Sequence, residues 1–241
     1  SAGNAGEYYT PRAVTDFIID RLNPQIGEKV ADFACGTGGF LISALNYMKD
    51  KKDNKLTLEE DIKLKKSLHG VEKKPMPHML CVTNLILHDI DTPDIIHSNS
   101  LAVNIRDYKD VDKFDVIAMN PPFGGTEEEG IKLNFPMEYR TSETADLFMA
   151  LILYRLKKGG RVGVVLPDGF LFGTDNAKVA IKRKLLEEYN LHTIVRLPQK
   201  VFAPYADVAS NLLFFNSEES TKDVWFFEHS LPEGYKSYSK T

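Results

Sequence analysis

A glycine-rich turn carries the strongest fold signal and reads Asp32-Phe33-Ala34-Cys35-Gly36-Thr37-Gly38-Gly39-Phe40. It overlaps the end of a short strand-like segment at 28–33 and precedes a segment at 40–49 with helical apolar spacing, so the pattern predicts strand, turn and helix. Glycines at such a junction let the backbone turn sharply and approach a ligand without a Cβ in the way. The turn therefore predicts a ligand site at the carboxyl end of a strand in an α/β fold.

The acid at the start of this turn narrows the class of ligand. A dinucleotide-binding turn has glycines at its first, third and sixth places, but the sixth place counted from Gly36 is Leu41. Asp32 would also repel a pyrophosphate, whereas it suits a cation such as S-adenosylmethionine, which carries a sulfonium and an amino group. From this motif alone, a plain glycine turn with no ligand stays open.

Working outward, strand-like and helix-like segments alternate along the chain, which predicts a mostly parallel sheet with helices on both faces. Strands are predicted at 28–33, 68–72, 94–98, 114–119, 161–167, 193–197, 209–215 and 225–227, and helices at 11–22, 40–49, 75–88, 145–156 and 176–189.

Several local expectations accompany these elements. Thr10 is the expected N-cap of the first helix with Pro11 at its first position, and Asn23-Pro24 is its expected end. We expect an exposed insertion with a short helix at 50–66 and a mobile polar loop at 126–141. The helix at 75–88 is expected to pack through the side that carries Met76, Met79, Leu80, Thr83 and Leu87.

Two further motifs follow predicted strands. Glu72 ends the second strand, where an acid can accept hydrogen bonds from both hydroxyls of a ribose; taken alone, it could be an ordinary surface glutamate. The fourth strand ends in Asn120-Pro121-Pro122-Phe123. Two consecutive prolines remove both backbone donors and leave carbonyl acceptors in a stiff loop.

This second motif predicts a chemistry. The Asn120 amide oxygen and the Pro121 carbonyl can accept both hydrogens of a planar NH₂ group, whose lone pair is otherwise delocalised. That arrangement favours a tetrahedral nitrogen aimed at an electrophilic methyl group, so catalysis rests on position and electrostatics. Phe123 offers a flat apolar face on which a base can stack.

With these motifs, the chain resembles the S-adenosylmethionine-dependent amino-methyltransferases, and in detail the modification subunit of type I restriction-modification systems. Their activity is methylation of adenine N6 in DNA. The resemblance implies that Asn120, Pro121, Pro122 and Phe123 form the catalytic tetrad. It also implies a cofactor site made by Glu7, Tyr8, Tyr9, Thr10, Pro11, Asp32, Ala34, Gly36, Thr37, Gly38, Gly39, Glu72 and Asn99.

The resemblance also implies partners. The segment at 197–202 is similar to one whose aromatic packs against a flipped target base, which makes Phe202 the expected partner of Phe123; an ordinary core role for Phe202 stays open. We expect double-stranded DNA with a flipped adenine as substrate. A DNA-specificity subunit and a restriction subunit are the expected protein partners.

The composition fits one globular domain. The chain has 241 residues, 43% of them hydrophobic and 27% charged, enough for the core of one α/β unit. We expect a single catalytic domain over 1–241, with an opening segment at 1–24, a cofactor-binding half at 25–110 and a catalytic half at 111–241. The first residue is not Met, so we expect a core cut from a longer subunit.

The net charge and the cysteine count limit the partners and the cellular location that we expect. A net charge of −4 predicts that this core does not bind DNA tightly by itself and that a partner supplies a positively charged surface. Two cysteines, Cys35 and Cys81, cannot make a disulfide framework, and the six histidines show no metal-ligand spacing, so we predict no metal and a cytoplasmic location. No apolar run approaches the ~18 residues of a membrane span, so no membrane partner is expected.

Two other functions stay open from the sequence. The same fold and cofactor could serve the amide of a protein glutamine or a base amine of RNA, since those methyltransferases use similar Asn-Pro-Pro tetrads. A non-catalytic scaffold that binds the cofactor and positions a partner is the second alternative. The acceptor geometry of 120–123 argues against that scaffold, which would have no need of it.

Overall fold

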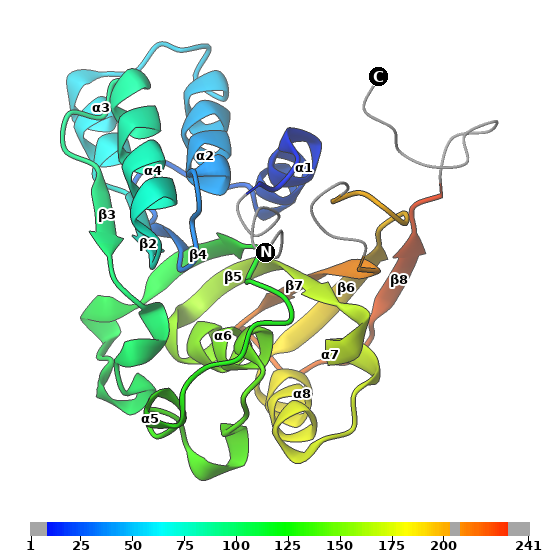
Figure 1. Ribbon diagram of the computed structural model, residues 1–241. Coiled ribbons are helices and arrows are strands. Elements are labelled where there is room, and N and C mark those ends of the chain that lie inside the picture. The colour runs from blue at the N-terminus through cyan, green and yellow to red at the C-terminus, as the bar shows by residue number, and fades with distance from the viewer. Residues whose placement is uncertain (1–8, 203–207, 231–241) are drawn as a thin grey trace.

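A single eight-stranded sheet organises residues 9–202 and 208–230, the ranges that the computed structural model describes. The strand order is β3-β2-β1-β4-β5-β7-β6-β8 (Figure 1). Neighbouring strands pair in parallel except at β7, which runs antiparallel to both β5 and β6. The strands are β1 (Val30–Asp32), β2 (Leu68–Glu72), β3 (Asp94–His97), β4 (Phe114–Met119), β5 (Leu156–Pro167), β6 (Asn190–Arg196), β7 (Ser210–Asn216) and β8 (Trp225–Glu228).

Helices cover both faces of this sheet, which confirms the predicted architecture (Figure 1). Helices α1, α2 and α4 pack on one face with α3 beside them, and α6 and α8 pack on the other. The helices are α1 (Arg12–Leu22), α2 (Gly39–Asp50), α3 (Leu58–Lys65), α4 (Pro75–Leu87), α5 (Glu129–Lys132), α6 (Thr144–Arg155), α7 (Asp168–Phe172) and α8 (Asn176–Glu188).

Strand β4 shows how the sequence buries the sheet on both faces. Val116 and Ala118 point into the core beneath α1 and α2, and Ile117 and Met119 point into the core beneath α6. Alternation along a strand gives each face every second residue, and a strand buried on both faces is apolar throughout. The carboxyl ends of β1, β2, β3 and β4 therefore meet at one edge of a rigid sheet.

Helix α1 begins one residue later than the sequence predicts. Pro11 is the N-cap, and no side chain caps the helix. The Thr10 hydroxyl instead accepts a hydrogen bond from Asn120, so a tertiary contact uses the group expected at the cap. The predicted stop is confirmed, because Asn23 is the C-cap in the left-handed conformation.

Helix α4 packs through a different face from the predicted one. Its buried residues are Pro77, Cys81 and Leu85. The helix is apolar on more than one side, so periodicity cannot choose which side faces the sheet. The residues expected to be buried are exposed: Met76, Met79, Leu80, Thr83 and Leu87.

The stretch at 126–141 is more structured than the predicted loop. It contains α5 and a 3-10 turn at Met137–Tyr139, and Phe135 is fully buried. A bridge between Thr126 and Glu143 joins its two ends. Phe135 and Tyr139, both buried in the core beneath α6, therefore anchor the stretch.

Strand β5 begins at Leu156, ahead of the predicted start at 161, and continues directly from α6. Its register with β4 shifts between Phe114 and Val116. Gly159 lies within this irregular part at a φ of 77°, a conformation that glycine adopts at little cost. The run Lys157-Lys158-Gly159-Gly160, which follows the predicted helix at 145–156, is thus an irregular strand start.

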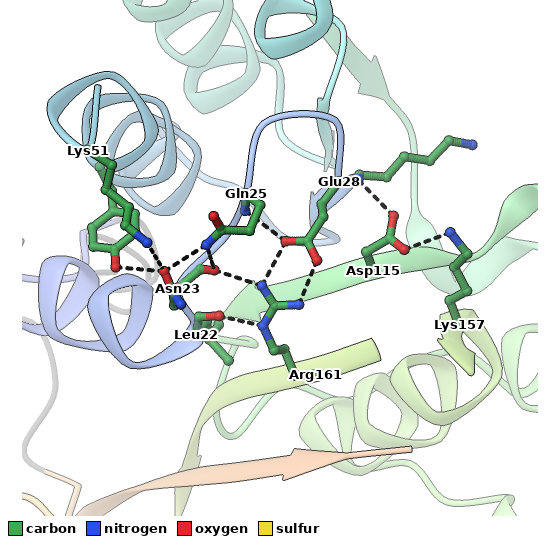
Figure 2. A network of polar contacts seen from close by, with 10 residues as sticks. Leu22, Asn23, Gln25, Glu28, Lys51, Asp115, Lys157 and Arg161 are labelled. Carbon is green, nitrogen blue, oxygen red and sulfur yellow. Dashed lines mark hydrogen bonds and ion pairs between the residues drawn. The ribbon is translucent and has the colours of Figure 1, made fainter. Parts of the chain in front are cut away.

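Arg161 ties the end of α1 to the sheet near the amino ends of β4 and β5 (Figure 2). Its guanidinium donates to the carbonyl oxygens of Leu22 and Asn23 and pairs with Glu28 at 2.7 Å. These contacts satisfy two of the carbonyls that a helix leaves unpaired at its carboxyl end.

Strand β8 forms one edge of the sheet and exposes three aromatic side chains. Trp225, Phe226 and Phe227 have exposed fractions of 67%, 72% and 56%. Across 9–202 and 208–230, none of the helices has the length and apolar character needed to cross a membrane.

Candidate active site

Two adjoining hollows lie at the carboxyl edge of the sheet, and Ala34 and Asn120 line both. The first hollow is lined by Tyr9, Thr10, Arg12, Thr15, Asp32, Ala34, Cys35, Gly36, Thr37, Gly39, Phe40, Asn84 and Asn120. The second hollow is lined by Phe33, Ala34, Glu72, Lys73, Lys74, Ser98, Asn99, Ser100, Asn120, Pro122, Glu127 and Phe148. The glycine turn, the acid after β2 and the asparagine after β4 are therefore brought together.

The turn between β1 and α2 depends on glycine at two positions. Gly36 and Gly38 have φ values of 55° and 87°, and Gly38 is the N-cap of α2. A Cβ on Gly38 would lie 2.8 Å from the Sγ of Cys81 in α4. The close approach of α4 and the left-handed backbone thus both require glycine here.

Asp32 ends β1 and is buried beneath the first hollow. Burial is the largest cause that raises the pKa of its carboxyl group, to about 8, and the negative charge of Glu72 raises it further. A hydrogen bond from the Ala34 N–H to Oδ1, at 3.0 Å, opposes this shift. A buried acid with a raised pKa is held ready for a cationic partner.

Glu72 and Asn99 both line the second hollow, but the protein's own groups already engage their side chains. The two carboxylate oxygens of Glu72 accept hydrogen bonds from the N–H groups of Gly36, at 2.9 Å, and Lys74, at 2.8 Å. Each carboxylate oxygen has a second lone pair for a ligand. Asn99 Oδ1 accepts from the Leu101 N–H at 3.0 Å, and Nδ2 donates to Glu127 at 3.4 Å, so the second Nδ2 hydrogen is the one left for a ligand.

Asn120 stands where the two hollows join. Its Nδ2 donates to the Thr10 Oγ1 at 3.1 Å. Its Oδ1 is buried and has no hydrogen-bond partner among the described residues. A buried acceptor without a partner is costly, and because Asn120 lines both hollows, this acceptor is a candidate for a hydrogen bond from a bound molecule.

Comparison with known proteins assigns the chain to a family. The sequence profile of the N-6 DNA Methylase family matches residues 1–241. The chain belongs to this family. The EcoEI methylase subunit of a type I restriction enzyme from Escherichia coli is 54% identical over 243 residues, which cover 100% of this chain and 48% of that subunit. The EcoKI methylase subunit from Escherichia coli strain K12 is 35% identical over 244 residues, covering 93% of this chain and 44% of that subunit.

Solved structures show the same relationship. A crystal structure of a modification subunit from Vibrio vulnificus YJ016 has a TM-score of 0.91 at 46% identity, covering 99% of this chain and 50% of that one. The crystal structure of the EcoKI M protein has a TM-score of 0.83 at 32% identity, covering 97% and 51%. This chain spans about half the length of the curated relatives that it matches.

The chain therefore has the Rossmann-like fold of S-adenosylmethionine-dependent methyltransferases, and S-adenosylmethionine is the methyl donor of the N-6 DNA methylase family. The residues present fit this cofactor. The buried acid Asp32 suits its positive charge, and the turn at Gly36 and Gly38 lets it approach the backbone closely. Asn120, whose Oδ1 has no partner among the described residues, lines both hollows beside that turn.

The two aromatic residues expected at a target base lie in contact. The rings of Phe123 and Phe202 are 6.5 Å apart between centroids and meet edge to face at 85°. Phe202 also lines a separate, larger cleft of about 1030 Å³ between α1 and the late strands, together with Tyr9 and Pro11. The expected residues Glu7 and Tyr8 lie outside the described ranges.

Sequence reasoning missed some of the residues that line the two hollows. Glu127 lines the second hollow, accepts a hydrogen bond from Asn99 Nδ2 at 3.4 Å and pairs with Lys73 at 3.4 Å. Asn84 of α4 lines the first hollow and donates to the Thr37 carbonyl at 3.2 Å. Glu127 begins the acidic run that we assigned to a loop, and only its place after the tetrad could have drawn attention to it. In the described ranges, no group of three or more metal-ligating side chains gathers.

Proposed function

We propose that this chain is the catalytic part of a DNA methyltransferase that transfers the methyl group of S-adenosylmethionine to adenine N6, as the modification subunit of a type I restriction-modification system. The observation that carries the proposal is the buried Asn120 Oδ1, which has no partner among the described residues and lies where the two hollows join. The single sheet supports treating residues 1–241 as one catalytic domain.

The chain's own groups supply acceptors for the target amine. Asn120 Oδ1 and the Pro121 carbonyl oxygen accept the two hydrogens of the adenine NH₂ group. These two hydrogen bonds direct the nitrogen lone pair away from the adenine ring. The rigid end of β4, which precedes Asn120, fixes the direction of the lone pair. The proton lost on methylation passes to water, so no general base is required.

The two hollows bind the cofactor. The turn with Asp32, Ala34, Gly36, Thr37, Gly38 and Gly39, together with the segment at 7–11, holds the methionine part, and Glu72 and Asn99 hold the adenosine part. When bound, S-adenosylmethionine supplies an electrophilic methyl group with a neutral thioether as leaving group. Asp32, ionised in the presence of the cation, balances the charge of the cofactor before transfer.

The aromatic residues Phe123 and Phe202 bind the target base. An adenine that has left the duplex is expected to stack on Phe123, with Phe202 at its edge or second face. The two rings are in contact in the protein without DNA, so one of them must turn or shift to admit a base. Stacking of a base on an aromatic side chain contributes about 1–3 kcal/mol, which offsets part of the cost of unstacking.

The partners follow from charge and from the relatives. A net charge of −4 leaves this core short of positive surface for a duplex. We propose that a specificity subunit reads the DNA sequence and that a restriction subunit joins the full assembly; the methylase subunits EcoEI and EcoKI belong to type I restriction enzymes. A DNA substrate and two free cysteines, Cys35 and Cys81, fit the cytoplasm.

A labelled-methyl assay tests the proposal. The full-length subunit, assembled with its specificity partner, is given labelled S-adenosylmethionine with duplex DNA, RNA or protein acceptors. We expect label on adenine N6 of DNA only. Label confined to protein or RNA, or no transfer to any acceptor, would overturn the proposal.

A matched pair of variants tests the mechanism in the same assay. Asn120→Ala removes one acceptor of the target amine and should lower kcat by roughly 100- to 1000-fold while cofactor affinity, measured by calorimetry, stays within a few-fold. Asn176→Ala, on the exposed start of α8, should leave both unchanged. Wild-type activity in Asn120→Ala would refute the role of this side chain.

A further inference from the structure

The contact between Thr10 and Asn120 joins the segment before α1 to the catalytic asparagine. We propose that Thr10 is a positioning residue, whose hydroxyl decides which atom of the Asn120 amide faces the target amine. The inference rests on the proposed function, because it concerns the orientation of the acceptor that the methylation needs.

Orientation matters because the two ends of an amide have the same shape and opposite chemistry. With Oδ1 toward the site, Asn120 accepts a hydrogen from the target amine. With Nδ2 toward the site, it presents a donor to another donor, and the amine loses an acceptor. Packing alone cannot distinguish the two orientations, so hydrogen-bond partners decide between them.

The structure shows one partner for this amide. Nδ2 donates to Thr10 Oγ1 at 3.1 Å, and Oδ1 is buried without a partner among the described residues. The hydroxyl therefore engages the nitrogen, which leaves the oxygen as the end of the amide that can accept a hydrogen from the target amine. The unpaired oxygen costs free energy in the protein alone. The hydrogen bond between Nδ2 and Thr10 offsets part of that cost.

A hydroxyl can also donate, and this property couples the amide to the first hollow. Thr10 lines that hollow, so an acceptor on a ligand there, such as a carboxylate, can take the hydroxyl hydrogen. The Thr10 oxygen is then committed to accepting, and only Nδ2 of Asn120 can satisfy it. Filling the first hollow would thus lock Asn120 in the orientation that receives the amine.

The segment that carries Thr10 is held firmly enough for this role. Thr10 is followed by Pro11, the N-cap of α1, and Arg161 fixes the far end of that helix through the carbonyls of Leu22 and Asn23 (Figure 2). Helix α1 also buries Ile18 and Ile19 completely against the sheet. The hydroxyl is therefore placed by a rigid element and not by a free loop.

A spectroscopic experiment on the 241-residue chain tests the hydrogen bond without any activity. Proton–nitrogen correlation spectra record the side-chain NH₂ of Asn120, identified by its loss in Asn120→Ala. We expect one NH₂ hydrogen to exchange slowly with water in the wild type and in Thr10→Ser. In Thr10→Val, which keeps the shape and removes the acceptor, exchange should accelerate at least tenfold. Should Thr10→Val fail to fold, Thr10→Ala gives the same comparison.

Adding S-adenosylhomocysteine extends the same experiment to the coupling. In the wild type and in Thr10→Ser it should slow exchange of the Asn120 NH₂ further; in Thr10→Val it should have no such effect. Thr83→Val, a change at an exposed threonine of α4 whose hydroxyl bonds its own helix, is the matched control and should resemble the wild type. An Asn120 signal that is the same in Thr10→Val and the wild type would overturn the proposal.

Kinetics of the full-length assembly separate positioning from cofactor binding. Thr10→Val should lower kcat at saturating cofactor by roughly 10- to 100-fold, the effect of one misdirected hydrogen bond in the transition state, and Thr10→Ser should restore it. A loss confined to cofactor affinity, with wild-type kcat, would overturn the positioning role. A wild-type assembly that forms no N6-methyladenine would instead refute the proposed function, and the spectra would still decide whether Thr10 orients Asn120.

Discussion

Asp32 is a carboxyl group that the fold buries almost completely, with an exposed fraction of 1%, and burial raises its pKa to about 8. A cation in the first hollow favours its ionised form. We therefore expect binding of S-adenosylmethionine to release a proton at about pH 6 to 7, and affinity to rise toward pH 8 by up to about tenfold per pH unit. Calorimetry in buffers of different ionisation enthalpy measures the release.

The control for this prediction is Asp32→Asn, which has no proton to release. The amino group of the cofactor itself titrates near pH 8, so the difference between the wild type and the variant is the quantity of interest. Equal proton release by both proteins would show that Asp32 does not ionise on binding.

The same raised pKa has the opposite consequence for the ligand-free protein. Because the folded-state pKa lies above the ordinary value of 3.8, the stabilisation by protonated Asp32 is full at low pH and is lost as pH rises toward 8. Unfolding free energy should fall by up to about 1.4 kcal/mol per pH unit in this window. Urea unfolding followed by circular dichroism, with Asp32→Asn as the reference, checks it; parallel pH dependences would contradict it.

At the scale of single residues, the sequence predicts the residue types of a site better than it predicts their hydrogen-bond partners. Asp32 and Asn120 stand out because the chemistry of a charged ligand and of a target amine demands those groups. Nothing in the sequence indicates that backbone N–H groups occupy both oxygens of Glu72, or that Thr10 contacts Asn120. Such partners depend on how distant segments meet at the sheet edge.

The turn between β1 and α2 gives a prediction at the scale of an element. Gly38→Ala places a Cβ 2.8 Å from the Cys81 Sγ on a backbone with φ of 87°. We expect a loss of about 1–3 kcal/mol in stability and weaker cofactor binding, measured by urea unfolding and calorimetry.

Two further variants separate the causes of that loss. Gly38→Ala combined with Cys81→Ala should recover cofactor affinity in part, because the contact is relieved and the left-handed backbone is not. Gly130→Ala, in α5 with open space around it, should leave stability and cofactor binding nearly unchanged. If Gly38→Ala behaved like Gly130→Ala, the close approach of α4 would not constrain the turn.

The bounds of an element were predictable where polar or proline residues follow it, but its buried face was not predictable where several of its sides are apolar. Strands β2 and β4 match the predicted bounds because their apolar runs end sharply at polar or proline residues. In α4, Cys81 and Leu85 are buried and Met76 is exposed, a choice that depends on how closely α4 approaches the glycine turn. Burial of Phe135 and Tyr139 likewise depends on tertiary contacts that the mostly polar stretch at 126–141 does not indicate.

Across the whole molecule, contacts at the amino edge of the sheet hold in place the elements that form the site at the carboxyl edge. Arg161→Ala removes hydrogen bonds to two helix-end carbonyls and the ion pair with Glu28. We expect a loss of about 1–3 kcal/mol in unfolding free energy and reduced order of the segment that carries Thr10. Urea unfolding measures the first effect, and faster amide hydrogen exchange at 9–12 measures the second.

A neighbouring ion pair provides the control (Figure 2). Lys157 pairs with Asp115 at 2.7 Å, and its side chain is 53% exposed. An exposed pair contributes about 0–1 kcal/mol, so Lys157→Ala should cost much less than Arg161→Ala. Equal losses of unfolding free energy in the two variants would mean that the hydrogen bonds to the helix-end carbonyls do not contribute to stability.

The layout of the whole sheet was predictable only in its first half. Alternation of strands and helices predicts parallel pairing, and β1 to β5 follow it. The strand β7 inserts antiparallel between β5 and β6, which no local pattern indicates, because a strand's direction depends on the path of the connection before it.

The exposed edge strand gives the protein a built-in optical reporter. Trp225 is the single tryptophan of the chain and lies on β8 with two-thirds of its surface in water. Its fluorescence will therefore change little when the core unfolds, but it will shift to shorter wavelength when another surface covers this edge. Titrating candidate subunits against that emission would show, without any label, which of them docks along β8.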